Sequence, residues 1–229
     1  MNDDSEQANE SIDAAIPTER TDEHFVERHA TFLKHIQTKP IGLLFLGDSI
    51  TRRWVDVPEL WHQYFAKYQP ANFGVGGDAV QNLLWRVQNG QIEGIKPRVI
   101  VLFIGTNNVP TNTGSEIAAA IGKVIDVIQS KLPQTKILLL AIFPRGPQTP
   151  ESANAQNPYY MDIVTAANKE LAALDNSDTV RFLDLGTLFI SSDGNINTDI
   201  MPDQLHLIEP GYKIWGEAMA ELLEEMMRG

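Results

Sequence analysis

The chain of 229 residues is acidic and has enough apolar residues for a core: its net charge is −12, 43% of it is hydrophobic, and it contains no cysteine. The missing cysteines exclude disulfides, thiolate metal sites and a cysteine nucleophile. An acidic surface repels phosphates, so nucleic acids and anionic membranes are poor partners, and no apolar run approaches the ~20 residues of a membrane span. We expect a globular protein that acts on a small neutral or positively charged molecule.

Much of the acidic charge lies at the N-terminus. Residues 1–23 hold eight acids and one arginine, a net charge of −7 (1 − 8), which leaves −5 for the rest of the chain. Residues 1–20 have no usable apolar period and are predicted to be a disordered tail on which no catalysis depends, ahead of a single domain over residues 21–229. Because the start of the chain lacks the basic and apolar segments of a signal peptide, we expect a cytoplasmic protein; secretion stays open if a signal was removed.

Apolar runs and helical patterns alternate along the chain. An apolar stripe over residues 25–36 predicts a helix ahead of Pro40, and later helices are expected over residues 117–132 and 212–227. Strands of a parallel sheet are covered on both faces and are therefore almost continuously apolar. Four segments of this kind cover residues 41–46, 99–104, 137–142 and 180–185, and a fifth, short strand is expected around residues 71–73. We predict a doubly wound α/β three-layer sandwich with five parallel strands in the flavodoxin-like order 2-1-3-4-5.

This strand order brings three loops to one edge of the sheet, at the switch point where such folds build their sites. The loops are Gly47-Asp48-Ser49, Gly74 to Asp78 and Gly105 to Asn108. A serine at the tip of a buried strand is a candidate nucleophile. Gly-Asp-Ser is also ordinary turn and helix-cap chemistry, so the tripeptide alone does not decide between the two.

A nucleophilic serine needs a base and a group that orients the base. Of five histidines only His206 follows the second predicted strand, and Asp203, three residues earlier, is placed to accept its Nδ1–H. The simpler interpretation is a helix start that Asp203 caps. The long connection over residues 186–205 favours a loop that carries His206 back over the site, because connections of this length are usually functional or disordered.

The other two loops offer donors for an oxyanion. The amides of Gly76 and Gly77 are candidates, although a tight turn explains these glycines equally well, and Asn107 and Asn108 are compatible with turn chemistry. The glycine loop matches neither nucleotide-binding motif, and the G-x-S-x-G elbow is absent. Residues 191–199 lack the glycine position and closing glutamate of a calcium loop, so we expect neither metal nor cofactor.

Four sequence blocks resemble, in type and order, those of the SGNH (GDSL) hydrolase superfamily. They are Gly47-Asp48-Ser49, Gly77-Asp78, Gly105-Thr106-Asn107-Asn108 and Asp203-x-x-His206. Further stretches resemble the catalytic subunits of type Ib platelet-activating-factor acetylhydrolase: Asn72 to Asp78, Leu84-Trp85-Arg86 and Pro144-Arg145-Gly146. The resemblance runs from about residue 29 to the C-terminus, and one mild departure is Ile50, which replaces the leucine of the GDSL motif.

The resemblance implies the SGNH hydrolase fold and a serine esterase in which Ser49 is the nucleophile, His206 the general base and Asp203 its orienting acid. We expect hydrolysis of a short acyl ester, acetyl first, through an acyl-enzyme. The superfamily also contains carbohydrate O-acetyl esterases, lysophospholipases and thioesterases, which stay open as alternatives. A non-catalytic binding or scaffold module is the alternative from another class.

The resemblance also implies the oxyanion donors, which would be the amides of Ser49 and Gly77 and the side chain of Asn107. Asp48 and Asn108 are expected to support the turns on which these groups lie. The loop over residues 143–158, rich in proline, asparagine and glutamine, is expected to wall the acyl or leaving-group pocket. The resembling acetylhydrolase subunits pair with one another, which leaves a homodimer open for this chain.

Overall fold

A five-stranded sheet forms the centre of the computed structural model, which describes residues 13–146 and 158–228. All strands are parallel and their order is β2-β1-β3-β4-β5. The strands are β1 (Leu43–Gly47), β2 (Pro70–Gly74), β3 (Val99–Phe103), β4 (Lys136–Leu140) and β5 (Val180–Leu183). The predicted parallel sheet and its strand order are confirmed, and the strand ends differ from the predicted ends by no more than two residues.

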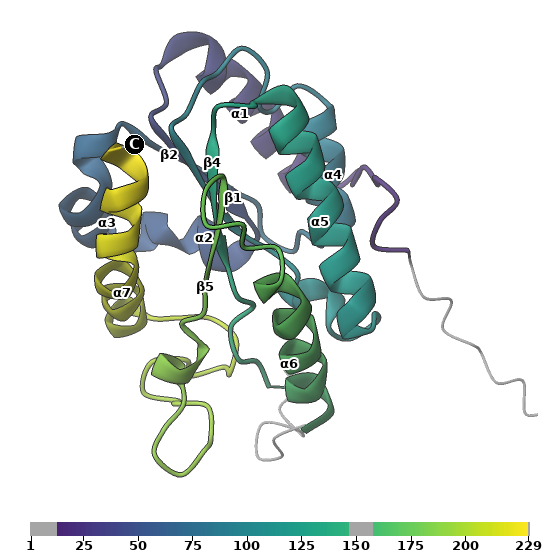
Figure 1. The fold of residues 1–229 in the computed structure, drawn as a ribbon, viewed down its shortest axis with the longest axis vertical. Helices are drawn as coiled ribbons and strands as arrows, with labels where there is room; N and C mark the ends of the chain where they lie inside the picture. The colour runs from purple at the N-terminus through teal and green to yellow at the C-terminus, as the bar shows by residue number, and fades with distance from the viewer. Residues whose placement is uncertain (1–12, 147–157, 229) are drawn as a thin grey trace, which may run out of the picture.

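Helices cover both faces of the sheet and complete the three layers (Figure 1). One face carries α1 (Glu23–Thr38), α4 (Val80–Gln88), α5 (Gly114–Lys131) and α6 (Pro158–Ala172), and the other carries α3 (Pro58–Phe65) and α7 (Glu209–Arg228). The short elements are α2 (Ser49–Arg52) and the 3₁₀ turns η1 (Arg53–Asp56), η2 (Ala66–Tyr68), η3 (Thr106–Asn108) and η4 (Gly186–Phe189). None of the helices in the described part of the chain is both long enough and apolar enough to cross a membrane.

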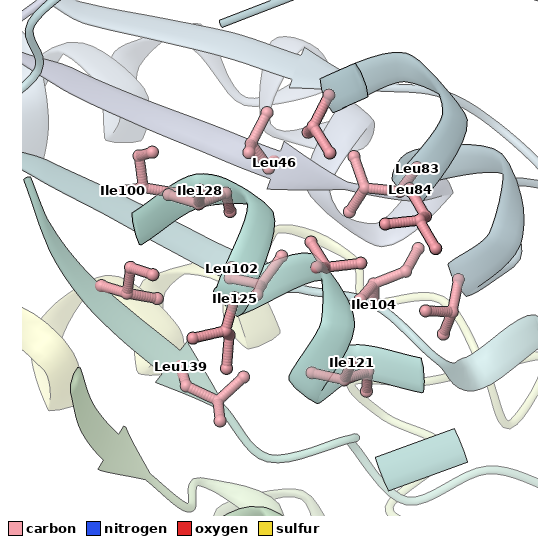
Figure 2. Close-up of a cluster of buried hydrophobic side chains, with 14 of the residues drawn as sticks. Leu46, Leu83, Leu84, Ile100, Leu102, Ile104, Ile121, Ile125, Ile128 and Leu139 are labelled. Atoms are coloured by element: carbon pink, nitrogen blue, oxygen red, sulfur yellow. The ribbon is translucent and has the colours of Figure 1, made fainter. Parts of the chain in front are cut away.

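The alternation of side chains along each strand divides the apolar interior into two cores. In the first, strand residues such as Leu46, Leu102 and Leu139 meet leucines of α4 and isoleucines of α5 (Figure 2). These side chains are almost completely buried. Since full burial of each is worth about 1.5–3 kcal/mol, this layer holds α4 and α5 firmly on the sheet, and α4 directly follows the Gly74 to Asp78 loop.

The second core is aromatic and anchors the short helix that begins at Ser49. Trp54 of η1 lies 4.8 Å from Tyr212 and 5.2 Å from Trp215 between ring centroids, both on α7. The hydroxyl of Tyr212 donates a hydrogen bond of 2.7 Å to the carbonyl oxygen of Ile50. This bond joins α7 to the backbone of α2 next to Ser49, and because it is buried, its loss would leave a polar group unpaired in the core.

The N-terminal segment differs from the predicted tail. Residues 1–12 lie outside the described residues, but residues 13–20 pack on the domain. Ala14 is 1% exposed within the first core, and Thr18 exchanges hydrogen bonds with Gln81 and Asn82 of α4. The prediction of a disordered tail is therefore wrong for residues 13–20. This segment has no helical or strand pattern in its sequence, and it is held by individual contacts with residues far away in the chain, which the pattern does not reveal.

Candidate active site

Ser49 is the first residue of α2, directly beyond the C-terminal tip of β1. The chain turns there in very little space: a β-carbon on Gly47 would lie 2.2 Å from the carbonyl oxygen of Phe103 and from Oγ1 of Thr51, so only glycine fits. Asp48 caps the helix, because its Oδ1 accepts the amide of Ile50 at 2.9 Å. The half-buried serine therefore lies on a turn that the Asp48 hydrogen bond holds in place.

Asp48 is itself completely buried. Burial raises its pKa from 3.8 to about 7, helped by the nearby charge of Asp78 and opposed by the Ile50 hydrogen bond and by Arg145. An acid with a raised pKa in the folded state binds more protons there than in the unfolded state. Its favourable contribution to stability is complete below 3.8 and is lost as the pH rises through about 7.

We predict that Asp48→Asn becomes more stable relative to wild type as the pH rises. Asparagine keeps the cap acceptor for Ile50 and has no charge to bury. A difference of about 3 between the two pKa values corresponds to about 4 kcal/mol at most. Urea unfolding at about pH 5 and about pH 8 should show wild type losing about 3 kcal/mol against the variant over this range. Parallel pH dependence of the two proteins would count against a buried, titrating Asp48.

Ser49, His206 and Asp203 form a continuous chain of contacts. Oγ of Ser49 lies 2.9 Å from Nε2 of His206, and Nδ1 of the same ring lies 2.6 Å from Oδ2 of Asp203. The serine and the histidine are 157 positions apart in the sequence. The structure thus brings together the three residues that the sequence singled out, in an order of contacts that suits proton transfer from the hydroxyl to the ring.

The segment of Asp203 and His206 is a loop, so its alternative interpretation as a capped helix start is wrong: α7 begins only at Glu209. Oδ1 of Asp203 accepts the amides of Leu205 at 3.0 Å and His206 at 2.7 Å, which closes the loop into a tight turn. Burial acts to raise the pKa of Asp203, but the hydrogen bonds from His206 and Leu205 prevail and hold it below its ordinary value. The carboxylate is therefore ionised at neutral pH and free to accept Nδ1–H.

The Gly77 and Asn107 loops meet beside the serine's turn. Gly77 has a positive φ of 78° and is exposed, whereas its neighbour Asp78 is fully buried. The side-chain amide of Asn107 donates a 2.9 Å hydrogen bond to the carbonyl oxygen of Asp78. A side-chain amide has two N–H donors, and this bond uses one of them. Within the described residues, the backbone amides of Ser49 and Gly77 donate no hydrogen bond. Amides of this kind are suited to binding an anion.

Asn108 has a structural place beneath this loop. Its side chain is buried, its Oδ1 accepts the amide of Val80 at 2.9 Å, and its Nδ2 donates to Gln81 and Asn112 at 2.9 and 3.1 Å. These bonds join η3 to the start of α4. Asn107 and Asn108 are adjacent in sequence but differ in surroundings, because only Asn107 lies partly open to solvent.

Two buried arginines near the site, Arg86 and Arg145, are not among the predicted site residues, although both lie in the resembling stretches. Arg86 donates to Asp78 at 2.8 Å and to the carbonyl oxygens of Phe73 at 3.1 Å and Gly47 at 3.2 Å. Arg145 donates to the carbonyl oxygen of Thr106. Each arginine therefore holds backbone at the end of a strand.

Two other expectations concern loops at this edge of the sheet. The loop expected to wall the pocket lies largely outside the described residues, since residues 147–157 are not described.

In the segment over residues 191–199, Oδ1 of Asp193 accepts the amide of Asn195 at 3.0 Å and Oδ1 of Asn197 accepts that of Asp199 at 3.0 Å. These acidic and amide side chains thus stabilise turns, and among the described residues no cluster of three metal-binding side chains forms.

Comparison with known proteins identifies the family. The model of the GDSL-like lipase/acylhydrolase family matches residues 45–214, from β1 into α7. The chain belongs to this family. Platelet-activating factor acetylhydrolase IB subunit alpha2 of Homo sapiens is 35% identical over 224 residues, covering 94% of both proteins, and the human alpha1 subunit is 31% identical over 90% of this chain and 85% of the subunit.

Solved structures agree on the fold. A GDSL-like lipase from Bacteroides thetaiotaomicron superposes with a TM-score of 0.70 at 18% identity, covering 87% of this chain and 97% of the lipase. A carbohydrate acetylesterase from Sinorhizobium meliloti has a TM-score of 0.63 at 18% identity, covering 81% and 99%. The expected SGNH fold and the expected class, a GDSL-type ester hydrolase, are confirmed.

Proposed function

We propose that this family member is a serine esterase that removes short acyl groups, acetyl above all. The observation that carries the proposal is the chain of contacts from Ser49 through His206 to Asp203, with distances of 2.9 and 2.6 Å. The acetyl preference is supported by the relatives at 31–35% identity, whose names describe acetylhydrolases. The nature of the leaving group is left to experiment, because a fold does not determine a substrate.

In the proposed reaction, Oγ of Ser49 attacks the ester carbonyl carbon while its proton passes to Nε2 of His206. Asp203 accepts Nδ1–H, which keeps the ring in the tautomer that can take this proton. The bond to the leaving alcohol then breaks and His206 protonates the alcohol oxygen, which leaves an acyl group on Ser49. Water attacks this acyl-enzyme with His206 again acting as base, and the carboxylic acid is released.

The carbonyl oxygen carries a negative charge in both tetrahedral intermediates. We propose that the amides of Ser49 and Gly77 and the side chain of Asn107 bind it. All three lie at adjacent tips of β1, β2 and β3, and Asn107 is tied to the loop of Gly77 by its bond to Asp78. Donors fixed before the reaction stabilise developing charge without reorganisation.

A panel of esters tests the proposal. It contains p-nitrophenyl esters of increasing chain length, acetylated sugars, acetylated xylan and acetylated lysophospholipid analogues. We expect p-nitrophenyl acetate to be cleaved with the highest kcat/KM of the aryl esters, and one class of acetylated substrate to exceed the others. A preference for acyl chains of about eight carbons or more, or no cleavage of any acetyl ester, would contradict a short-acyl esterase.

The names of the curated relatives describe subunits. On that ground we also propose that this chain forms a homodimer. Sedimentation velocity of the purified protein distinguishes a dimer from a monomer.

A further inference from the structure

An arginine outside the predicted domain contacts the loop that carries Gly77. Nη1 of Arg20 donates to the carbonyl oxygen of Gly76 at 2.7 Å and to Oδ1 of Asp78 at 2.9 Å. These acceptors lie on either side of Gly77. The separation in sequence is 56 and 58 positions, so the contacts join the N-terminal segment to the edge of the sheet where the candidate site lies.

The bond to Gly76 controls the direction of the Gly77 amide. The carbonyl of Gly76 and the N–H of Gly77 belong to one planar peptide group, and in a trans peptide the two point in opposite directions. The structure contains no cis peptide bond among the described residues. A donor that fixes the Gly76 oxygen on one side therefore directs the Gly77 N–H to the other side. This fixation matters at Gly77. Glycine has more backbone freedom than any other residue, so without an outside contact its φ of 78° would be held less firmly.

Asp78 connects Arg20 to the other proposed oxyanion donors. Its two carboxylate oxygens are held by Arg20 and by the fully buried Arg86, which also donates to the carbonyl of Gly47 ahead of the serine's turn. The backbone carbonyl of Asp78 accepts the side chain of Asn107. Asp78 thus connects the ends of β1, β2 and β3, through its carboxylate and its backbone carbonyl. Arg20 is the partner of the carboxylate on the solvent side, with a side chain 24% exposed.

Arg20 is held in place by its own surroundings. Its Nε donates at 2.9 Å to Asp22, the residue that caps α1, and its guanidinium lies 5.4 Å from the ring centroid of Phe25. The preceding segment is fixed by the Thr18 bonds to α4. A guanidinium with a fixed plane and several donors can hold two acceptors in defined positions, which a lysine does less well.

We propose that Arg20 is a positioning residue for catalysis, which orients the Gly76–Gly77 peptide so that the Gly77 amide points at the oxyanion. This inference rests on the proposed function, in which Gly77 is an oxyanion donor. Arg20 does not touch the substrate in this account and acts through Gly77. The N-terminal segment is then part of the working enzyme although it lies outside the three layers.

Arg20→Ala and Arg20→Lys test the proposal with p-nitrophenyl acetate, in the full-length protein and at a temperature at which thermal unfolding shows each variant to be folded. We expect kcat to fall about 10- to 100-fold in Arg20→Ala, because a misdirected donor weakens the transition state, while KM changes less than about threefold. Arg20→Lys should lose less kcat than Arg20→Ala, since the lysine ammonium can replace one of the two hydrogen bonds of the guanidinium. Methylguanidinium in solution should restore part of the kcat of Arg20→Ala.

The matched control is Lys123→Gln. Lys123 contacts the same N-terminal segment, through a 3.4 Å bond to the carbonyl oxygen of Ala15, and has no bond to the glycine loop. This variant removes one positive charge and one contact of the segment, and we expect it to keep the wild-type kcat. A loss of kcat in Lys123→Gln as large as that in Arg20→Ala would overturn the proposal, because general loosening of the segment would then explain both.

Wild-type kcat in a folded Arg20 variant would also overturn the proposal. If Arg20→Ala does not fold, Arg20→Lys decides by the same criterion. Ser49→Ala, assayed in parallel, separates this inference from the proposed function. Activity that survives in Ser49→Ala removes the proposed function and the positioning role with it. An inactive Ser49→Ala beside a fully active Arg20→Ala removes the positioning role alone.

Discussion

Replacement of Ser49 by alanine is expected to lower kcat by about 10,000-fold or more, and His206→Ala should have a similar effect. The hydroxyl forms the covalent bond to the acyl group, and the ring takes its proton across the 2.9 Å contact between them. Because the serine and the histidine act together in one step, the losses of kcat from the two substitutions are far from additive. The double variant should therefore be hardly slower than either single variant.

The measurement is kcat for p-nitrophenyl acetate, with thermal unfolding as the control for folding. Both side chains lie half-buried at the edge of the sheet and not in its core, so we expect the melting temperature of each variant to stay close to that of wild type. An Ser49→Ala variant that keeps more than about a tenth of wild-type kcat would contradict the assignment, since residual activity without the nucleophile is expected to be several orders of magnitude lower.

Asn107→Ala should lower kcat about 100- to 1000-fold with the fold intact, which corresponds to the loss of about 3–4 kcal/mol of transition-state stabilisation. The side chain supplies a donor that the developing oxyanion needs and the substrate carbonyl needs less, so KM should change much less than kcat. Steady-state kinetics with p-nitrophenyl acetate measures both.

The adjacent Asn108→Ala is the matched comparison. Its side chain is buried and holds the start of α4, so its removal leaves the amide of Val80 and the side chain of Gln81 without their partner. We expect a loss of about 1–3 kcal/mol in the free energy of unfolding, whereas Asn107→Ala should lose little stability. If the two variants lost stability and activity alike, Asn107 would have no place in the proposed oxyanion hole.

Much of the fold could be predicted because the strands are buried on both faces. Runs such as residues 41–46 and 99–104 have few polar residues, which in a parallel sheet is the signature of a central strand. The strand ends were less accurate because apolar residues continue past the last ladder bond. Ile41 and Ala141, for example, are buried although they lie outside β1 and β4.

The candidate site was accessible from the sequence through strand order. Once strands 1, 2 and 3 were adjacent, Ser49, Gly77 and Asn107 had to lie at one edge of the sheet. The return of His206 over the serine was harder to foresee, since it depends on the path of a loop that has no periodicity. Arg20 could not be foreseen at all: a polar, acidic segment has the composition of a tail, and the contacts that fix it reach Gly76 and Asp78 more than fifty positions away.

Covalent labelling of Ser49 tests the central claim most directly. The enzyme is incubated with an organophosphonate that imitates the tetrahedral intermediate, digested and examined by mass spectrometry. We predict that the phosphonyl mass appears on the peptide that contains Ser49 in step with loss of activity, that it is absent in Ser49→Ala, and that it forms far more slowly in His206→Ala. Full inactivation with the adduct on another residue, or an active enzyme in which Ser49 never reacts, would contradict the account.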